Sequence, residues 1–194
     1  MVRILIDKME KYAKEHNVPI MLPDGIEFLE NYIKENNVVT ILELGTAIGY
    51  SAIRMARMNS DIRIVTIERD EERYLEAKKN IAKAGMEKQI QVLYMDIMDF
   101  ETDEIFDLIF IDAAKSQYIK FFEKFENNLK KGGVIISDNL DFHGLTKQET
   151  RIESKNLRQM VGKIRNYILY LKENKKFKTT FLEIGDGIGI SVKL

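Results

Sequence analysis

The sequence contains no cysteine, only two histidines and no long apolar run. Without cysteine the chain forms neither a disulfide framework nor a reactive thiolate, so any metal must be held by oxygen atoms or by a histidine. No stretch approaches the ~20 apolar residues that a membrane helix needs. The first segment, MVRILIDKMEKYAKEHN, alternates charged and apolar residues, which is unlike a signal peptide. We therefore expect a cytoplasmic protein without a membrane partner.

Charges of the two signs are nearly balanced, because the 194 residues carry a formal net charge of −1. That balance predicts no polyanionic partner. The distribution is less even, since the 155–178 segment holds eight basic residues against the single acid Glu173. Such a segment is either a nucleic-acid footprint or the solvated face of a helix, and composition by itself favours the solvated face. The eight are Lys155, Arg158, Lys163, Arg165, Lys172, Lys175, Lys176 and Lys178.

The spacing of the apolar residues predicts one α/β domain spanning 1–194. Amphipathic helices are expected over 3–16 and 25–36, separated by NVPIMLPD with both prolines, and Asp24 is a candidate N-cap. Five short β-branched runs then alternate with helix-length segments, which indicates a parallel sheet covered on both faces. These runs are VVTILELG, RIVTIER, IQVLYMD, FDLIFID and GVIISDN.

Glycines mark several expected boundaries. Gly85 is expected to end the helix EERYLEAKKNIAKAG, and the 132–133 glycine pair to end FFEKFENNLKKGG. A long helix over 152–174 follows. Two strands then flank Asp186 and Gly187, a typical hairpin turn, so the sheet is expected to finish with an antiparallel pair.

The loop after the first predicted strand, LELGTAIGYS, is the expected cofactor site, because ligands of open α/β sheets bind beyond the carboxyl ends of the strands. Gly45 permits close backbone approach. The Gly-x-x-x-Gly spacing differs from that of pyrophosphate binders and suits a nucleoside such as S-adenosylmethionine. Glu68, at the end of the second strand, suits the ribose hydroxyls, and Asp96, after the third, is placed to face the adenine. Each acid alone also fits a strand-end or helix-cap role.

Acidic and amide side chains also follow the fourth and fifth strands. Asp112 ends IFID, and Asp138 and Asn139 end GVIISDN. If the two strands are neighbours, these three oxygen ligands meet at one edge and favour a hard cation such as Mg²⁺. A turn is the alternative interpretation of the Ser-Asp-Asn sequence.

Lys115 comes three residues after Asp112, in the expected first turn of the next helix. Such a lysine is commonly a surface residue. A nearby divalent cation would disfavour its ammonium form, which makes Lys115 a candidate general base. His143 lies just past Asn139 and is expected in a loop that touches substrate.

These motifs resemble those of the metal-dependent O-methyltransferases, the family of the catechol and caffeoyl-CoA enzymes. The likeness rests on ILELGTAIGYSAIRMA, IFIDAAKSQY and GVIISDN, and it runs from about Val18 to the C-terminus. It implies the class I S-adenosylmethionine methyltransferase fold. That fold is a Rossmann-like three-layer sandwich, whose mostly parallel seven-stranded sheet ends in a C-terminal antiparallel hairpin.

The resemblance also implies roles for single residues. Asp112, Asp138 and Asn139 match the Mg²⁺ ligands, and Lys115 matches the proposed base, with Asp112 also facing the cofactor. Met21 matches a cofactor contact, so the 1–36 N-terminal helical segment would close over the site. The full set of matched cofactor positions is Met21, Glu43, Gly45, Ser51, Glu68, Asp96, Ile97 and Asp112.

A finer likeness, to bacterial tRNA 5-hydroxyuridine methyltransferases, rests on VPIM, GTAIGYSAIRMA, TIERDEERYLEA and LRQMVGKIRNY. It implies Mg²⁺-dependent methylation of 5-hydroxyuridine to 5-methoxyuridine in the tRNA anticodon loop, with the basic 155–178 segment holding phosphates. The family further implies a homodimer. A small catechol or phenol acceptor is the alternative, because it too offers vicinal oxygens. A nucleotide-binding module without catalysis is a third interpretation, which the set of Asp112, Asp138, Asn139 and Lys115 disfavours.

Overall fold

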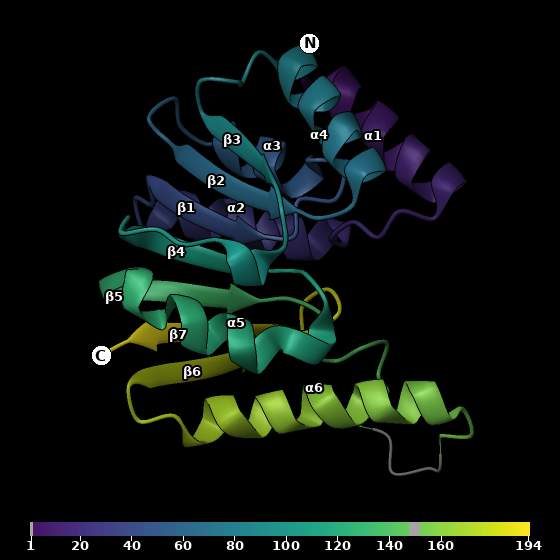
Figure 1. Cartoon of the computed structure of the whole chain (residues 1–194), viewed down its shortest axis with the longest axis vertical. Helices are drawn as coiled ribbons and strands as arrows, with labels where there is room; N and C mark the ends of the chain where they lie inside the picture. The colour runs from purple at the N-terminus through teal and green to yellow at the C-terminus, as the bar shows by residue number, and fades with distance from the viewer. Residues whose placement is uncertain (1, 148–151) are drawn as a thin grey trace.

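The computed structural model describes residues 2–147 and 152–194 and contains a seven-stranded sheet (Figure 1). The strands lie in the order β3-β2-β1-β4-β5-β7-β6. β1 to β5 pair in parallel, whereas β7 runs antiparallel to both β5 and β6. The predicted sheet with its C-terminal antiparallel pair is therefore confirmed. The strands are β1 Thr40–Leu44, β2 Arg63–Glu68, β3 Ile90–Tyr94, β4 Phe106–Ile111, β5 Leu129–Ser137, β6 Phe177–Leu182 and β7 Ile188–Lys193.

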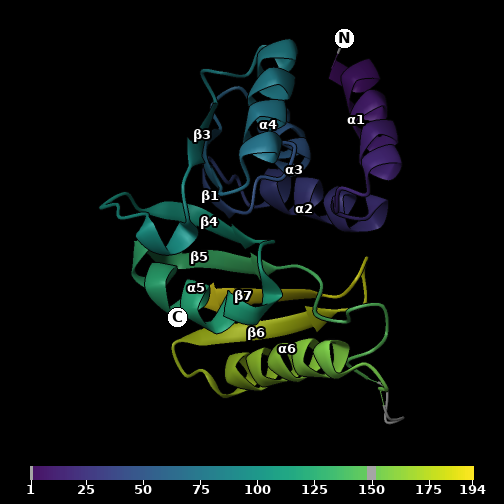
Figure 2. The ribbon, with the colours of Figure 1, turned by 45° about the vertical axis from the view of Figure 1, so that its right-hand side comes forward.

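Helices cover both faces of this sheet, which completes the three layers (Figure 2). Four of them pack on one face with Ile41 and Leu108, and two pack on the other face with Leu42 and Ile109. The split follows from the strands, since successive side chains point to opposite faces. The first group is α1 Val2–His16, α2 Pro23–Glu35, α3 Tyr50–Ala56 and α4 Glu71–Ala84, and the second is α5 Tyr118–Phe125 and α6 Lys155–Glu173.

The central strand β4 is buried along its whole length, as its sequence FDLIFI, apolar except for Asp107, predicts. Its neighbours β1 and β5 lie on either side. Burying one such large apolar side chain is worth about 1.5–3 kcal/mol, so this strand is a main source of stability. It also carries Asp112 to the carboxyl edge of the sheet, immediately after its last residue.

Two predicted boundaries are wrong. Asp24 does not cap α2, because the helix begins one residue earlier at Pro23, whose fixed φ suits a first helical position. Its carboxylate instead accepts hydrogen bonds from the backbone N–H of Gly25 and of Gly185. The 132–133 glycine pair does not end a helix either, since α5 stops at Phe125 and the pair lies inside β5.

Other boundaries agree with the sequence pattern. Gly85 ends α4 in a left-handed conformation with φ 68°, as predicted. α6 begins at Lys155, later than expected, because the Ser154 hydroxyl caps it by accepting from the Leu157 N–H. The hairpin between β6 and β7 is present, with a longer connection over 183–187. None of the described helices is long and apolar enough to cross a bilayer.

Candidate functional site

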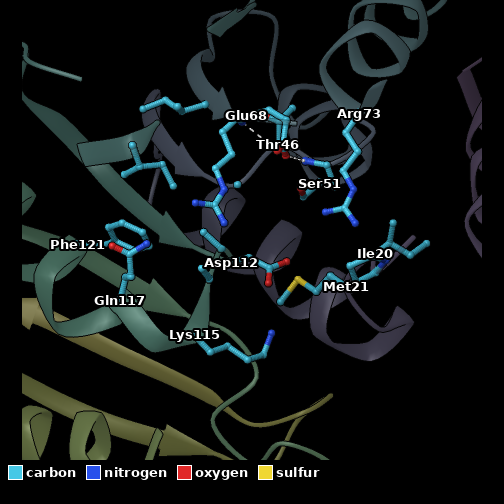
Figure 3. Close-up of a pocket in the computed structure, with 18 of the residues that line it drawn as sticks. Ile20, Met21, Thr46, Ser51, Glu68, Arg73, Asp112, Lys115, Gln117 and Phe121 are labelled. Carbon is cyan, nitrogen blue, oxygen red and sulfur yellow. Dashed lines mark hydrogen bonds between the residues drawn. The ribbon is translucent and has the colours of Figure 1, made fainter. Parts of the chain in front are cut away.

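A cavity of about 260 Å³ lies beyond the carboxyl ends of β1 to β4 (Figure 3). Strand order reverses here, because β1 is followed by β2 on one side and pairs with β4 on the other. Such a switch point is where open α/β sheets bind their ligands. Seven of the eight predicted cofactor positions line it, together with the predicted base Lys115; the seven are Met21, Gly45, Ser51, Glu68, Asp96, Ile97 and Asp112.

Gly45 begins the loop that forms one wall of the cavity. It has φ 106°, a conformation that favours glycine. A Cβ atom there would lie 2.3 Å from the backbone oxygen of Asp112, far inside van der Waals contact. Glycine is therefore required where the loop passes the end of β4. Gly49, with φ 82°, then precedes the first turn of α3.

Glu43 was predicted to contact the cofactor, but the structure places it behind the glycine loop. The carboxyl is fully buried and does not line the cavity. It accepts hydrogen bonds from the hydroxyls of Ser51 and Thr66, each at 2.5 Å. Burial raises the pKa of Glu43 to about 8, an effect that these two hydrogen bonds partly offset. Its role in the described contacts is to fix Ser51 and β2 around the loop.

The raised pKa of Glu43 predicts a specific pH dependence of stability. Between its unfolded pKa near 4.5 and about 8, the folded carboxyl holds a proton that the unfolded chain releases. Stability therefore falls as pH rises through this window, by at most about 1.4 kcal/mol per pH unit. Glu43→Gln removes the titration, so its stability relative to the wild type is expected to improve with pH. Urea unfolding of both proteins across the window measures this, and a constant difference would contradict it.

Glu68 fixes the other side of the loop. It is buried at the end of β2, and its carboxylate accepts from the backbone N–H groups of Ala47, Arg69 and Asp70, at 2.8–2.9 Å. These three bonds hold the carboxylate in place and use only part of its acceptor capacity. Asp96 is half-buried nearby, accepts from the Met98 N–H and pairs with Arg69.

Asp112 and Asp138 lie at the ends of the paired strands β4 and β5. Withdrawal from water raises the pKa of both carboxyls, and the charge of Asp112 raises that of Asp138 further. One oxygen of Asp138, Oδ1, is buried without a hydrogen-bond partner among the described residues. Two buried carboxyls that interact electrostatically and an oxygen without a hydrogen-bond partner fit the binding of a cation.

The predicted metal set fits this arrangement. Asn139 directly follows Asp138 with φ 61°, and the three side chains provide only oxygen ligands for a hard cation. Among the described residues no group of three or more histidine, cysteine or acidic side chains is placed to hold a metal. The predicted set is of a different kind, since it has two acids and an amide. The metal therefore stays a prediction.

Lys115 begins the short 3₁₀ helix Lys115–Gln117, after Asp112. Figure 3 shows it reaching along the lower side of the cavity, with Asp112 and Met21 above it. Its ammonium lies 6.0 Å from the centre of the Phe142 ring. It is close enough to Asp112 for its charge to lower the pKa of that carboxyl. His143, by contrast, is exposed and does not line the cavity.

The segment between α1 and α2 forms the remaining wall. Pro19, Ile20 and Met21 line the cavity, and Met21 is only 4% exposed. Sequence patterns had indicated Met21 only by resemblance. They missed Arg73, Gln117 and Phe121, which also line the cavity. The signal for these was their position in the first turns after β2 and β4, which border the carboxyl edge of any such sheet.

A hydrogen-bonded cluster joins this wall to the glycine loop. The Tyr50 hydroxyl, in the first turn of α3, donates to Glu10 of α1 at 2.7 Å and accepts from Arg54. Arg54 in turn makes two bonds to the carboxylate of Glu30 in α2, at 2.5 and 2.8 Å. Charge-assisted bonds of this bidentate kind are strong. They tie both N-terminal helices to the helix that starts at the cofactor loop.

The family of the protein follows from a family model described as O-methyltransferase, which matches residues 3–194. The chain therefore belongs to the O-methyltransferase family. The class I fold that the resemblance implied is confirmed by the sheet order and by the solved relatives.

Individual relatives agree with this assignment. A catechol O-methyltransferase of Niastella koreensis is 35% identical over 68% of this chain and 62% of its own length. A Staphylococcus aureus protein, provisionally described as a caffeoyl-CoA O-methyltransferase, is 38% identical with a TM-score of 0.94, over 97% of this chain and 92% of that one. An O-methyltransferase from Bacillus cereus, solved in complex with SAH, is 27% identical with a TM-score of 0.84, over 98% and 90%.

Proposed function

We propose that the protein transfers the methyl group of S-adenosylmethionine to a hydroxyl oxygen of a small catechol-type acceptor. The observation that carries the proposal is the single cavity in which the Gly45 loop, Glu68 and Asp96 adjoin Asp112 and Lys115. In the reaction a C–O bond forms, the sulfonium C–S bond breaks, and the hydroxyl proton leaves to a base.

The cofactor is proposed to lie along the carboxyl edge of β1 to β3. Glu68 would accept from the ribose hydroxyls with its remaining lone pairs, and Asp96 and Ile97 would border the adenine. Ser51 and Met21 close the cavity from α3 and from the N-terminal segment. The Bacillus cereus relative was solved with SAH, the demethylated product of the same cofactor, which supports the choice.

Asp112, Asp138 and Asn139 are proposed to hold a divalent cation, with Mg²⁺ as the expected ion. When bound, such an ion acts as a Lewis acid and as a template for vicinal oxygens. The chain's own contribution is to gather the two carboxyls at adjacent strand ends, with the Asp138 oxygen left unpartnered. Lys115, whose charge acts on Asp112, is proposed to take the acceptor proton.

A small acceptor is favoured by two of the relatives, which are named for catechol and caffeoyl-CoA substrates. A catechol offers two adjacent oxygens, one to be methylated and one to be held. The finer prediction from the sequence, tRNA 5-hydroxyuridine, has no support from the relatives described above. It remains a second candidate because one observation favours it. All eight basic residues of the 155–178 segment are exposed, on α6, the turn after it and the start of β6. The implied homodimer also remains a prediction.

One experiment separates the two acceptors. The protein is incubated with labelled S-adenosylmethionine, Mg²⁺ and, separately, catechol, guaiacol or tRNA containing 5-hydroxyuridine. We expect rapid labelling of catechol, and little labelling of guaiacol, whose second oxygen is already methylated. Preference for the tRNA, lost on charge reversal at Arg158 and Lys163, would replace the small acceptor with the second candidate. Labelling of no vicinal-oxygen compound would contradict the proposal.

A further inference from the structure

The hairpin turn between β6 and β7 contains a buried carboxylate to which the proposed function gives no role. Asp186 is 5% exposed and lies against the segment that follows β5. Its Oδ2 accepts a hydrogen bond from the Asn139 side-chain nitrogen at 3.4 Å, and its Oδ1 accepts from the His143 N–H at 2.5 Å. Both partners belong to the stretch that begins with the predicted metal ligands.

The backbone of the turn brings Asp186 into this position. The Leu140 N–H donates to the oxygen of Gly187 at 2.9 Å, and the Asp141 N–H donates to the oxygen of Asp186 at 2.7 Å. Gly187 has φ 85°, and a Cβ atom there would lie 2.5 Å from the Asp141 nitrogen. The turn and the segment therefore pack without room for a side chain, and Asp186 is held between them.

The segment held in this way is strained. Asn139, Phe142 and His143 have φ values of 61°, 47° and 57°, in the left-handed region that residues with a Cβ adopt at a cost. Such conformations persist where the surroundings fix them. Here the fixing contacts to Asn139 and His143 include both oxygens of Asp186.

The chemistry of the contact determines which way the Asn139 amide faces. An ionised carboxylate only accepts hydrogen bonds, and an amide has one donor end and one acceptor end. Asp186 must therefore take the nitrogen end of Asn139. The oxygen end is then the one turned away from Asp186 and available as a ligand.

We propose that Asp186 is a positioning residue that orients the Asn139 amide for cation binding and fixes the backbone as far as His143. This inference rests on the cation of the proposed function. A partner that orients a ligand commonly accounts for 10–100-fold in metal affinity. A role confined to holding the hairpin would leave the cation affinity of a folded variant unchanged.

The test uses Mn²⁺ as a probe and measures its free concentration by electron paramagnetic resonance. Asp186→Asn keeps the size of the side chain and one acceptor for the His143 N–H, but it presents a second donor to Asn139. We expect Mn²⁺ affinity to fall roughly 10–100-fold, with S-adenosylmethionine affinity and thermal unfolding close to those of the wild type.

Two further variants control for a general loosening of the turn. Asp24→Asn alters a carboxylate of α2 that accepts a hydrogen bond from Gly185 in the same hairpin turn but makes none with Asn139, and this variant is expected to bind Mn²⁺ normally. Combining Asp186→Asn with Asn139→Asp exchanges donor and acceptor across the same contact, so affinity is expected to recover.

The outcomes separate this inference from the proposed function. Normal Mn²⁺ binding by Asp186→Asn, or an equal loss in Asp24→Asn, would overturn the positioning role while leaving the cation in place. Failure of the exchanged pair to recover would overturn it as well. If the wild-type protein itself binds no Mn²⁺, the cation of the proposed function is lost and the positioning role with it.

Discussion

Replacing Asp138 with alanine is expected to lower methyl transfer roughly 100-fold or more, because it removes a predicted ligand of the cation rather than a partner of one. Asp138 is 2% exposed and carries the buried oxygen without a partner. Initial rates and Mn²⁺ titration of the variant measure the effect, and S-adenosylmethionine affinity serves as the internal control.

The stability of a second variant at this position, Asp138→Asn, measured without divalent ions, distinguishes a ligand from a structural carboxylate. Burial and the charge of Asp112 raise the pKa of Asp138, so the fold disfavours the ionised carboxylate. The free energy of unfolding of the wild type therefore falls as pH rises above the pKa that Asp138 has in the unfolded chain. Asp138→Asn, which keeps the shape without the charge, is therefore expected to be at least as stable as the wild type at neutral to alkaline pH. A large loss of stability together with unchanged transfer would show that the residue serves the fold and not the reaction.

Gly45→Ala is expected to weaken cofactor binding at least tenfold. The added Cβ would lie 2.3 Å from the Asp112 oxygen and 3.1 Å from the Ala113 Cα, and both are backbone atoms that cannot rotate away. Either the loop moves out of the cavity or the end of β4 shifts with Asp112. Both responses separate the two halves of the site. Isothermal titration with S-adenosylmethionine is expected to show at least a tenfold loss, about 1.4 kcal/mol.

The matched control is Gly85→Ala. Gly85 also has a positive φ, 68°, but a Cβ there meets nothing within 4 Å. This variant is expected to lose about 1 kcal/mol of stability from backbone strain and to bind the cofactor normally. If both variants bound S-adenosylmethionine equally well, the requirement for glycine at position 45 would come from backbone strain alone and not from the close approach of the Asp112 backbone.

Much of the fold was predictable because each strand has a local signature. The mostly apolar sequence of β4 and the carboxylates at or just after the ends of β2, β3, β4 and β5 indicated both the sheet type and the edge at which the site forms. Boundaries were less predictable. The 132–133 glycines look like a helix end, yet they lie in β5, because Gly133 packs against the Asp107 oxygen at the edge of β4.

The site, like the fold, had parts that the sequence predicted and parts that it did not. Residues at strand ends were predictable because their position depends only on the direction of the strands. Glu43 was expected in the cavity and lies behind it, since its side chain alternates to the face covered by α3. Asp186 was read only as part of a turn, because nothing in Asp186-Gly187 indicates that this turn folds back on Asn139. Contacts across 47 positions of sequence are set by packing, not by local pattern.

The first two helices are needed to complete the cavity. Residues 19–21 supply a wall of the cavity, and the Arg54 cluster anchors the helices on either side of them. A fragment starting at β1 would retain every strand-end motif by which this family is recognised. It would nevertheless lack one wall of the cavity and leave the methyl donor open to solvent on that side. The presence of these motifs alone therefore does not show that such a fragment has a closed site.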